Sequence, residues 1–163
     1  MKKSFFLTLL FAFFSSFMLN SQNLYANTLN ILVNQITVNQ NFENQDKESE
    51  NVLLFMDSLM DYMFSTGIIV SSEKVSLAKN LSNDEKIAMK ACREGYFDYL
   101  AIIKVNVDAE TGELLNASWN IKEVSSNSEK SKGYLVSTKN ATDFGNEVAK
   151  NICTKTKFKN ASF

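Results

Sequence analysis

The part of this sequence that most constrains the fold is the segment from residue 99 to residue 138. Apolar and polar side chains alternate along residues 99–107 and again along residues 113–124, which is the period of a β-strand covered on one face. The residues between these two stretches have the composition of a hairpin turn. Residues 125–132 are interpreted as a flexible polar loop, after which residues 133–138 return as a third strand. The segment therefore predicts an antiparallel meander with one apolar face.

On either side of the meander, apolar residues recur at steps of three and four, the pattern of amphipathic helices. Helices are predicted over residues 51–65, 82–95 and 140–155, and further strands over residues 29–39 and 68–70. A capping box beginning at Ser82 is predicted to open the second helix. The predicted fold is α/β of the α+β type, a mixed sheet with a C-terminal antiparallel meander and three helices packed on one face. Its order is β-α-β-α-β-β-β-α.

The first 26 residues have the plan of a secretory signal peptide, with a basic start, an apolar run over residues 4–19 and a small residue at Ala26. The run is shorter than the roughly 20 residues of a membrane-spanning helix, so a permanent anchor is not predicted. We predict a signal peptide at residues 1–26, cleaved after Ala26 or alternatively after Ser21, and a single domain at residues 27–163. The mature protein is expected in the periplasm or outside the cell, without a stable membrane anchor.

Composition limits the chemistry that the mature domain can perform. The chain contains no His, which removes the usual general base and the usual metal ligand. Two of the 17 basic residues lie in the leader, so the mature domain has 15 basic and 18 acidic residues and a net charge of −3. This charge, without a basic stripe, does not fit a nucleic-acid binder. No metal, cofactor or nucleic acid is predicted, and the chain is interpreted as non-catalytic. The alternative is a small envelope enzyme that uses carboxylates such as Asp57 and Asp61, one helical turn apart.

Two cysteines, Cys92 and Cys153, lie on the apolar faces of the second and third predicted helices. Export to an oxidising compartment permits a disulfide between them, since helices on one sheet face can be neighbours. Two buried, unreactive thiols are the other interpretation, because free Cys is among the most buried residue types. The sequence leaves both interpretations open.

The polar face of the meander is the candidate surface for binding a partner. Its side chains alternate with the apolar ones on the first two strands, and they are Lys104, Asn106, Asn116, Ser118, Asn120 and Lys122. Simple solvation of these side chains is an equally good interpretation. If they bind, the protein is an exported, non-catalytic binding or assembly-accessory module that contacts an envelope protein. A structural subunit of an envelope complex is a further alternative, and it would show a large apolar surface patch.

A short motif carries a resemblance to a recurring module of envelope proteins. It consists of Gly95-Tyr96-Phe97-Asp98-Tyr99 with the apolar residues 100–103, followed by Thr111-Gly112 in the next hairpin. Over residues 29–155 the chain resembles the amino-terminal domain of TolB, the periplasmic part of curli-secretion lipoproteins and the lipoprotein activators of penicillin-binding proteins. The resemblance implies a binding or assembly module without catalytic activity. The chain departs from the two lipoprotein families in having no Cys near the predicted cleavage point.

Overall fold

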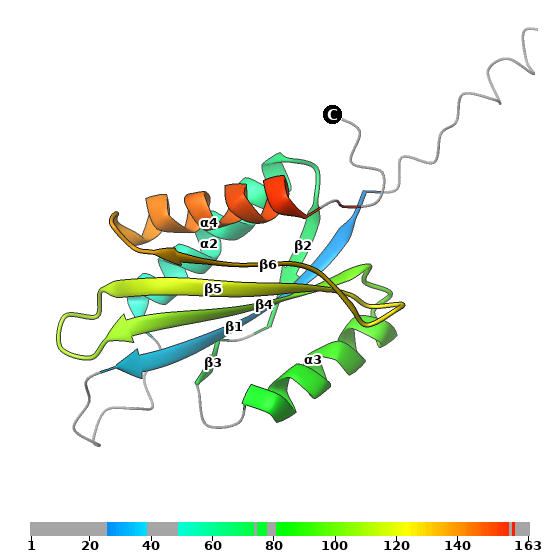
Figure 1. Cartoon of the computed structure of the whole chain (residues 1–163), viewed down its shortest axis with the longest axis horizontal. Coiled ribbons are helices and arrows are strands. Elements are labelled where there is room, and N and C mark those ends of the chain that lie inside the picture. The colour runs from blue at the N-terminus through cyan, green and yellow to red at the C-terminus, as the bar shows by residue number, and fades with distance from the viewer. Residues whose placement is uncertain (1–25, 39–48, 74, 78–80, 157, 159–163) are drawn as a thin grey trace, which may run out of the picture.

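The computed structural model describes residues 26–38, 49–73, 75–77, 81–156 and 158. Its elements in chain order are β1 (Thr28–Val38), α2 (Glu50–Ser65), β2 (Ile69–Ser72), β3 (Ser76–Leu77), α3 (Leu81–Glu94), β4 (Tyr99–Asp108), β5 (Leu114–Glu123), β6 (Ser128–Val136) and α4 (Ala141–Lys155) (Figure 1). The predicted order is confirmed, apart from the short additional strand β3. Except for Ala26, the predicted signal peptide lies outside the described residues. No described helix is long and apolar enough to cross a lipid bilayer.

The strands form one mixed sheet in which β1 is central. β1 runs parallel to β2, β3 and β4, whereas β4, β5 and β6 are antiparallel neighbours. The order across the sheet is β2-β1-β4-β5-β6, so the predicted mixed sheet with its C-terminal meander is confirmed. The central place of β1 explains why its apolar and polar residues do not alternate cleanly. From Leu29 to Gln35 every side chain is buried, whichever face of the sheet it lies on.

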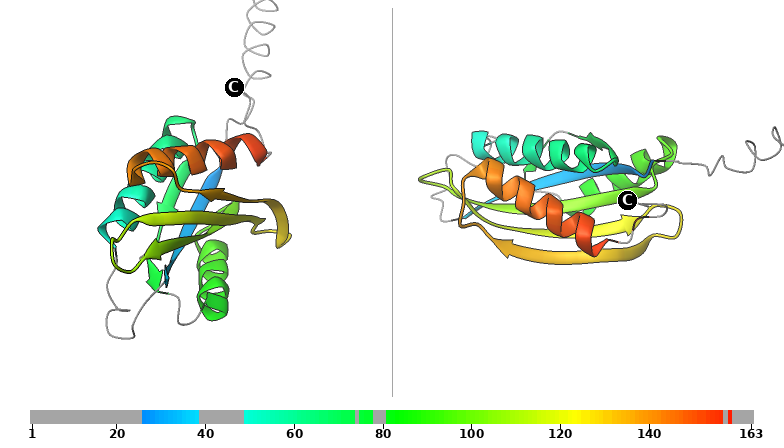
Figure 2. Two further views of the ribbon diagram at one scale, coloured as in Figure 1. Left: turned by 60° about the vertical axis from the view of Figure 1, so that its left-hand side comes forward. Right: turned by 90° about the horizontal axis from the view of Figure 1, so that it is seen from above.

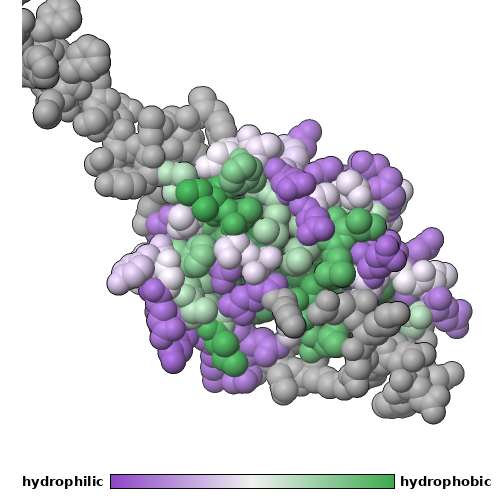
Figure 3. Space-filling model, turned by 180° about the vertical axis from the view of Figure 1, so that it is seen from behind, coloured by the Kyte–Doolittle hydropathy of each residue, from purple (hydrophilic) through white to green (hydrophobic). Residues whose placement is uncertain are grey.

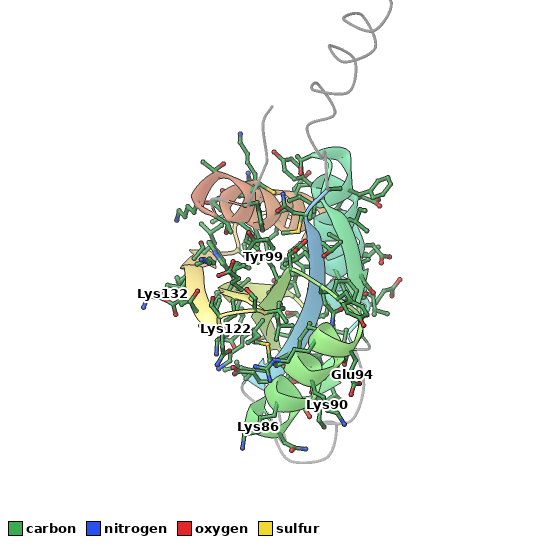
Figure 4. All side chains as sticks on the ribbon, turned by 90° about the vertical axis from the view of Figure 1, so that its right-hand side faces the viewer. Lys86, Lys90, Glu94, Tyr99, Lys122 and Lys132 are labelled. Atoms are coloured by element: carbon green, nitrogen blue, oxygen red, sulfur yellow. The ribbon has the colours of Figure 1, made fainter. Side chains whose placement is uncertain are left out.

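The helices lie on both faces of the sheet, so the prediction that all three share one face is wrong. α2 and α4 cover one face, and α3 lies against the other (Figure 2, Figure 4). The core beneath α3 consists of Leu32, Ala88, Met89, Cys92, Leu100, Ile102 and Val124. The first half of β4 is apolar on both faces, and Leu100 and Ile102 point away from α2 and α4. These side chains need a second layer, which α3 provides.

Strand β6 begins at Ser128, inside the segment predicted as a flexible loop. It can begin there because Asn127, with a φ of 53°, completes a tight turn directly after β5. The polar composition that predicted a loop belongs instead to an edge strand, where charged side chains such as Glu129 and Lys132 face water. The loop prediction is therefore wrong from Ser128 onward. The predicted capping box rests on the Ser82 side chain, which lies outside the described part of the structure.

Candidate functional site

All six residues predicted for the binding face lie on the sheet face that carries α3. That helix runs beneath only one end of the face (Figure 1), where it packs on Leu100 and Ile102. Farther along the strands Lys104 is exposed, and Asn106, Asn116 and Ser118 are half-buried. Asn120 is also half-buried and lies opposite Ile102, at the border of the covered part. The structure therefore brings these polar side chains together beside the part of the face that α3 covers.

The third strand of the meander adds two large apolar side chains to this surface. Tyr134 stands opposite Ser118 and Val136 opposite Asn116, and their side chains are 57% and 60% exposed. Sequence reasoning missed both residues, although the signal was present. Side chains alternate along a strand, so Tyr134 and Val136, which flank Leu135, must point to the face opposite to it. Leu135 packs against the core beneath α2 and α4. Lys104, Asn106, Asn116, Ser118, Asn120, Tyr134 and Val136 together are called the open sheet face below.

Some polar groups of the open sheet face bond to neighbouring side chains. The Asn106 amide donates to the Asn116 side-chain oxygen across the β4–β5 pair at 3.0 Å. The Asn120 amide donates to the Glu129 carboxylate on β6 at 3.1 Å. Lys104 is exposed, and within the described part of the chain its ammonium group forms no salt bridge. Among the described residues, the surface thus combines ordered amides with a lysine, Lys104, that has no carboxylate partner.

Lys122 differs from the other five predicted residues. Its ammonium group contacts the carboxylate of Glu85 on α3, and its side chain is only 22% exposed. A partly buried pair of this kind is screened less by salt than an exposed one. Lys122 therefore ties α3 to β5 at the covered end of the face, and it does not belong to the open sheet face.

The motif behind the family resemblance joins three elements of the fold. One carboxylate oxygen of Asp98 accepts hydrogen bonds from the backbone N–H and the hydroxyl of Thr28, both at 2.9 Å. The Asp98 backbone N–H donates to the Thr28 hydroxyl at 2.9 Å. Phe97 packs against the core beneath α3, and Tyr96 takes a φ of 57° to make the turn. The motif therefore fixes the end of α3 and the start of β4 to the start of β1.

The two cysteines are free thiols on opposite faces of the sheet. Cys92 belongs to the core beneath α3, whereas Cys153 packs against the core beneath α2 and α4. Burial raises the pKa of both thiols. A hydrogen bond from Asn30 opposes the shift for Cys92, and one with Thr66 opposes it for Cys153. This placement removes the shared helix layer on which the disulfide interpretation depended, and it agrees with the interpretation of two buried thiols.

The carboxylates of the alternative enzyme hypothesis, Asp57 and Asp61, are both exposed on α2. A hollow of about 680 Å³ runs along α4, lined by Tyr62 and by polar side chains such as Lys150, and another of about 520 Å³ lies beside Asn140. Neither hollow is lined by Asp57 or Asp61. Within the described ranges no three His, Cys, Asp or Glu side chains lie together where they could hold a metal ion. The pair is therefore placed on a surface and not in an enclosed site.

Sequence comparison identifies a family for this chain. A family model described as "Uncharacterised protein" matches residues 34–163. The chain belongs to this family. The match begins within β1 and includes every later element, so the whole open sheet face lies inside it. No curated protein matches the sequence.

Three solved structures are similar to this one. A PelC dodecamer from Paraburkholderia phytofirmans is 14% identical with a TM-score of 0.46, over 82% of this chain and 90% of PelC. The LpoB C-terminal domain from Salmonella enterica is 14% identical with a TM-score of 0.47, over 76% and 92%. TolB from Acinetobacter baumannii is 14% identical with a TM-score of 0.45, over 80% of this chain but only 28% of TolB. These similarities agree with the predicted resemblance to TolB and to the activator lipoproteins, and they concern the fold alone.

Proposed function

We propose that this protein is an exported, non-catalytic binding or assembly-accessory protein of the cell envelope, and that it binds a protein partner through the open sheet face. The observation that supports the proposal is the incomplete cover of that face by α3. At the uncovered end, β4 and β5 present polar side chains beside two exposed large apolar ones on the edge strand β6, Tyr134 and Val136. Protein interfaces commonly combine aromatic anchors with a surrounding polar rim in this way.

The rigidity of the surface favours binding. Every contact position lies on a strand that pairs with a neighbouring strand, and the Asn106–Asn116 hydrogen bond orders two of the side chains. A preformed surface loses little conformational entropy when a partner docks. Tyr134 offers an apolar ring together with a hydroxyl group, and Lys104 offers a positive charge. We therefore expect the partner to present an apolar pocket for the ring beside a carboxylate or another acceptor.

Site-specific crosslinking in the native host tests the proposal. A photoreactive phenylalanine analogue replaces Tyr134, and the cells are irradiated before the envelope is fractionated. Tyr96 is the matched control position, since its side chain is also aromatic and is 91% exposed, but it lies at the end of α3 away from the open sheet face. We expect one discrete envelope protein to be captured at position 134 and not at position 96.

A second measurement separates recognition from mere proximity. Lys104→Glu, placed in the crosslinking background, should abolish the captured band, while Lys150→Glu, an equal charge change on the exposed side of α4, should leave it. Equal capture at positions 134 and 96, or none at either, would contradict binding through the open sheet face. Export is tested on the same material, because the protein recovered from the envelope should begin at Asn27. An intact leader on a cytosolic product would contradict that part.

A further inference from the structure

The exposed side of α2 carries an unusual mixture of residues. Positions three and four apart on a helix lie on one face, and the exposed members of this face are Glu50, Leu53, Leu54, Asp57, Asp61 and Phe64. These six residues are called the α2 stripe below. Its three apolar side chains are 37%, 45% and 68% exposed, in chain order. Figure 3, which views the molecule from behind, shows apolar and polar groups intermixed on the side where α2 and β2 lie.

The charges of the α2 stripe have a single sign. The sequence of α2 contains no Lys or Arg, and Asp57 and Asp61 form no salt bridge with any residue that the structure describes. Two like charges one helical turn apart repel each other by about 0.2–0.5 kcal/mol. Among the residues that the structure describes, therefore, no side chain covers the apolar members of the stripe or supplies a positive counter-charge to its aspartates.

We propose that the α2 stripe is the docking surface for a cationic amphipathic segment of a partner protein, one that carries Lys or Arg beside aliphatic side chains. Such a segment would bury Leu53, Leu54 and Phe64 and would neutralise the two aspartates in one step. The apolar members extend from Leu53 to Phe64, which is about 16 Å along the helix axis. A partner helix of about three turns matches that length. The inference does not depend on the proposed function, because the α2 stripe and the open sheet face lie on different sides of the sheet.

The sign of the charge distinguishes this occupant from two others. A second copy of the chain, docked stripe to stripe, would bring Asp57 and Asp61 against their own equivalents with no base in either helix to pair with them. An anionic lipid surface would repel the same carboxylates. A partner segment that carries positive charges beside aliphatic side chains complements both the acidic and the apolar members of the stripe.

A binding titration with two model peptides tests the proposal. The full chain, expressed with its leader and purified after export, is titrated against labelled amphipathic helical peptides of identical pattern, one of leucine and lysine and one of leucine and glutamate. Fluorescence anisotropy reports binding. We expect the lysine peptide to bind at least about tenfold more tightly than the glutamate peptide, with an affinity that falls as salt is added.

Variants then locate the binding. Asp57→Asn with Asp61→Asn should weaken binding of the lysine peptide about tenfold, and Phe64→Ser should do the same by removing the largest apolar contact. The matched controls are Glu110→Gln with Glu113→Gln, two exposed acids of the β4–β5 turn, and Ile87→Ser, a 54% exposed side chain on α3. All these positions are exposed, so circular dichroism should show each variant folded.

Four outcomes would overturn the inference. The two peptides bind equally, or the controls weaken binding as much as the stripe variants do. Alternatively, sedimentation shows a dimer that Phe64→Ser abolishes, which would make a second copy the occupant. In the fourth outcome the protein floats with phosphatidylglycerol vesicles and Phe64→Ser abolishes this flotation, which would make a lipid surface the occupant of the stripe. Any one of these results excludes a cationic protein segment as the occupant.

Discussion

Replacing Gly145 with alanine should destabilise the protein, although alanine is the better helix former. Gly145 lies in the interior of α4 at its contact with α2. A β-carbon built there would overlap both the Ser58 hydroxyl oxygen and the backbone oxygen of Phe55. The hydroxyl can rotate, but a backbone oxygen within a helix cannot. The two helices must therefore move apart to admit a methyl group.

The expected magnitude follows from two opposing effects. Helix propensity favours alanine over glycine by about 1 kcal/mol. Overpacking a closed contact costs typically about 1–3 kcal/mol, and here it also separates the rings of Phe55 and Phe144, whose centroids are 5.6 Å apart. We expect a net loss of about 1–2 kcal/mol in the free energy of unfolding. With a urea m-value of about 2 kcal/mol/M, the midpoint should fall by about 0.5–1 M.

Urea unfolding followed by tryptophan fluorescence measures this loss, because Trp119 is the only tryptophan and is buried beneath α4. Thr142→Ala is the matched control, since it lies on the exposed side of the same helix and should change the midpoint little or raise it slightly. Adding Ser58→Ala to Gly145→Ala should recover only part of the loss, because the backbone oxygen of Phe55 remains. A Gly145→Ala protein that is more stable than the parent would refute the reasoning.

Four further predictions concern the packing of Trp119, the motif and the thiols. Gly133→Ala should shift the tryptophan emission to the red, because a β-carbon there would overlap the Trp119 ring and force it outward; unchanged emission would contradict the contact. Asp98→Ala should lower the free energy of unfolding by about 1–2 kcal/mol, because it removes the hydrogen bonds that the Asp98 carboxylate accepts from Thr28. A loss below about 0.5 kcal/mol would show that the motif does not stabilise the junction of α3, β4 and β1. Native protein should react slowly with a thiol reagent, yet yield two thiols per chain once unfolded without reductant; recovery of none would establish a disulfide. Because burial raises the pKa of Cys92, its contribution to stability is complete at neutral pH and is lost above about pH 8.5. The urea midpoint of Cys92→Ala should then fall less between pH 8 and pH 10 than that of the parent.

Much of the fold was predictable because local pattern and final structure agree. The alternation along β4 and β5 identified the meander, and the spacing of apolar residues identified all three helices to within about a residue of their ends. The start of α4 is also set locally. Asn is a preferred residue at a helix N-cap, and the Asn140 side chain accepts a hydrogen bond from the Asp143 backbone N–H and caps α4. The polar start of β6 was misread because an exposed edge strand and a loop share the same composition.

The candidate surfaces were only partly predictable. Five of the six predicted residues share the open sheet face, because strand periodicity fixes which side chains point the same way. Tyr134 and Val136 completed that face only once β6 was paired with β5. The α2 stripe was also predicted only in part, since Asp57 and Asp61 were recognised as neighbours on the helix, but its exposed apolar members were assigned to neither face.

The sequence by itself determined the elements and their inner faces, because backbone periodicity and side-chain polarity are local properties. Which layer each helix joins was decided only by the tertiary structure. α3 lies opposite α2 and α4 because Leu100 and Ile102 are apolar on the second face of β4, and Leu32 of β1, which is distant in sequence, joins the same core. The same decision separated Cys92 from Cys153, left one end of the sheet face uncovered and placed the α2 stripe in solvent. Burial depends on what packs from elsewhere in the chain, and no local pattern encodes it.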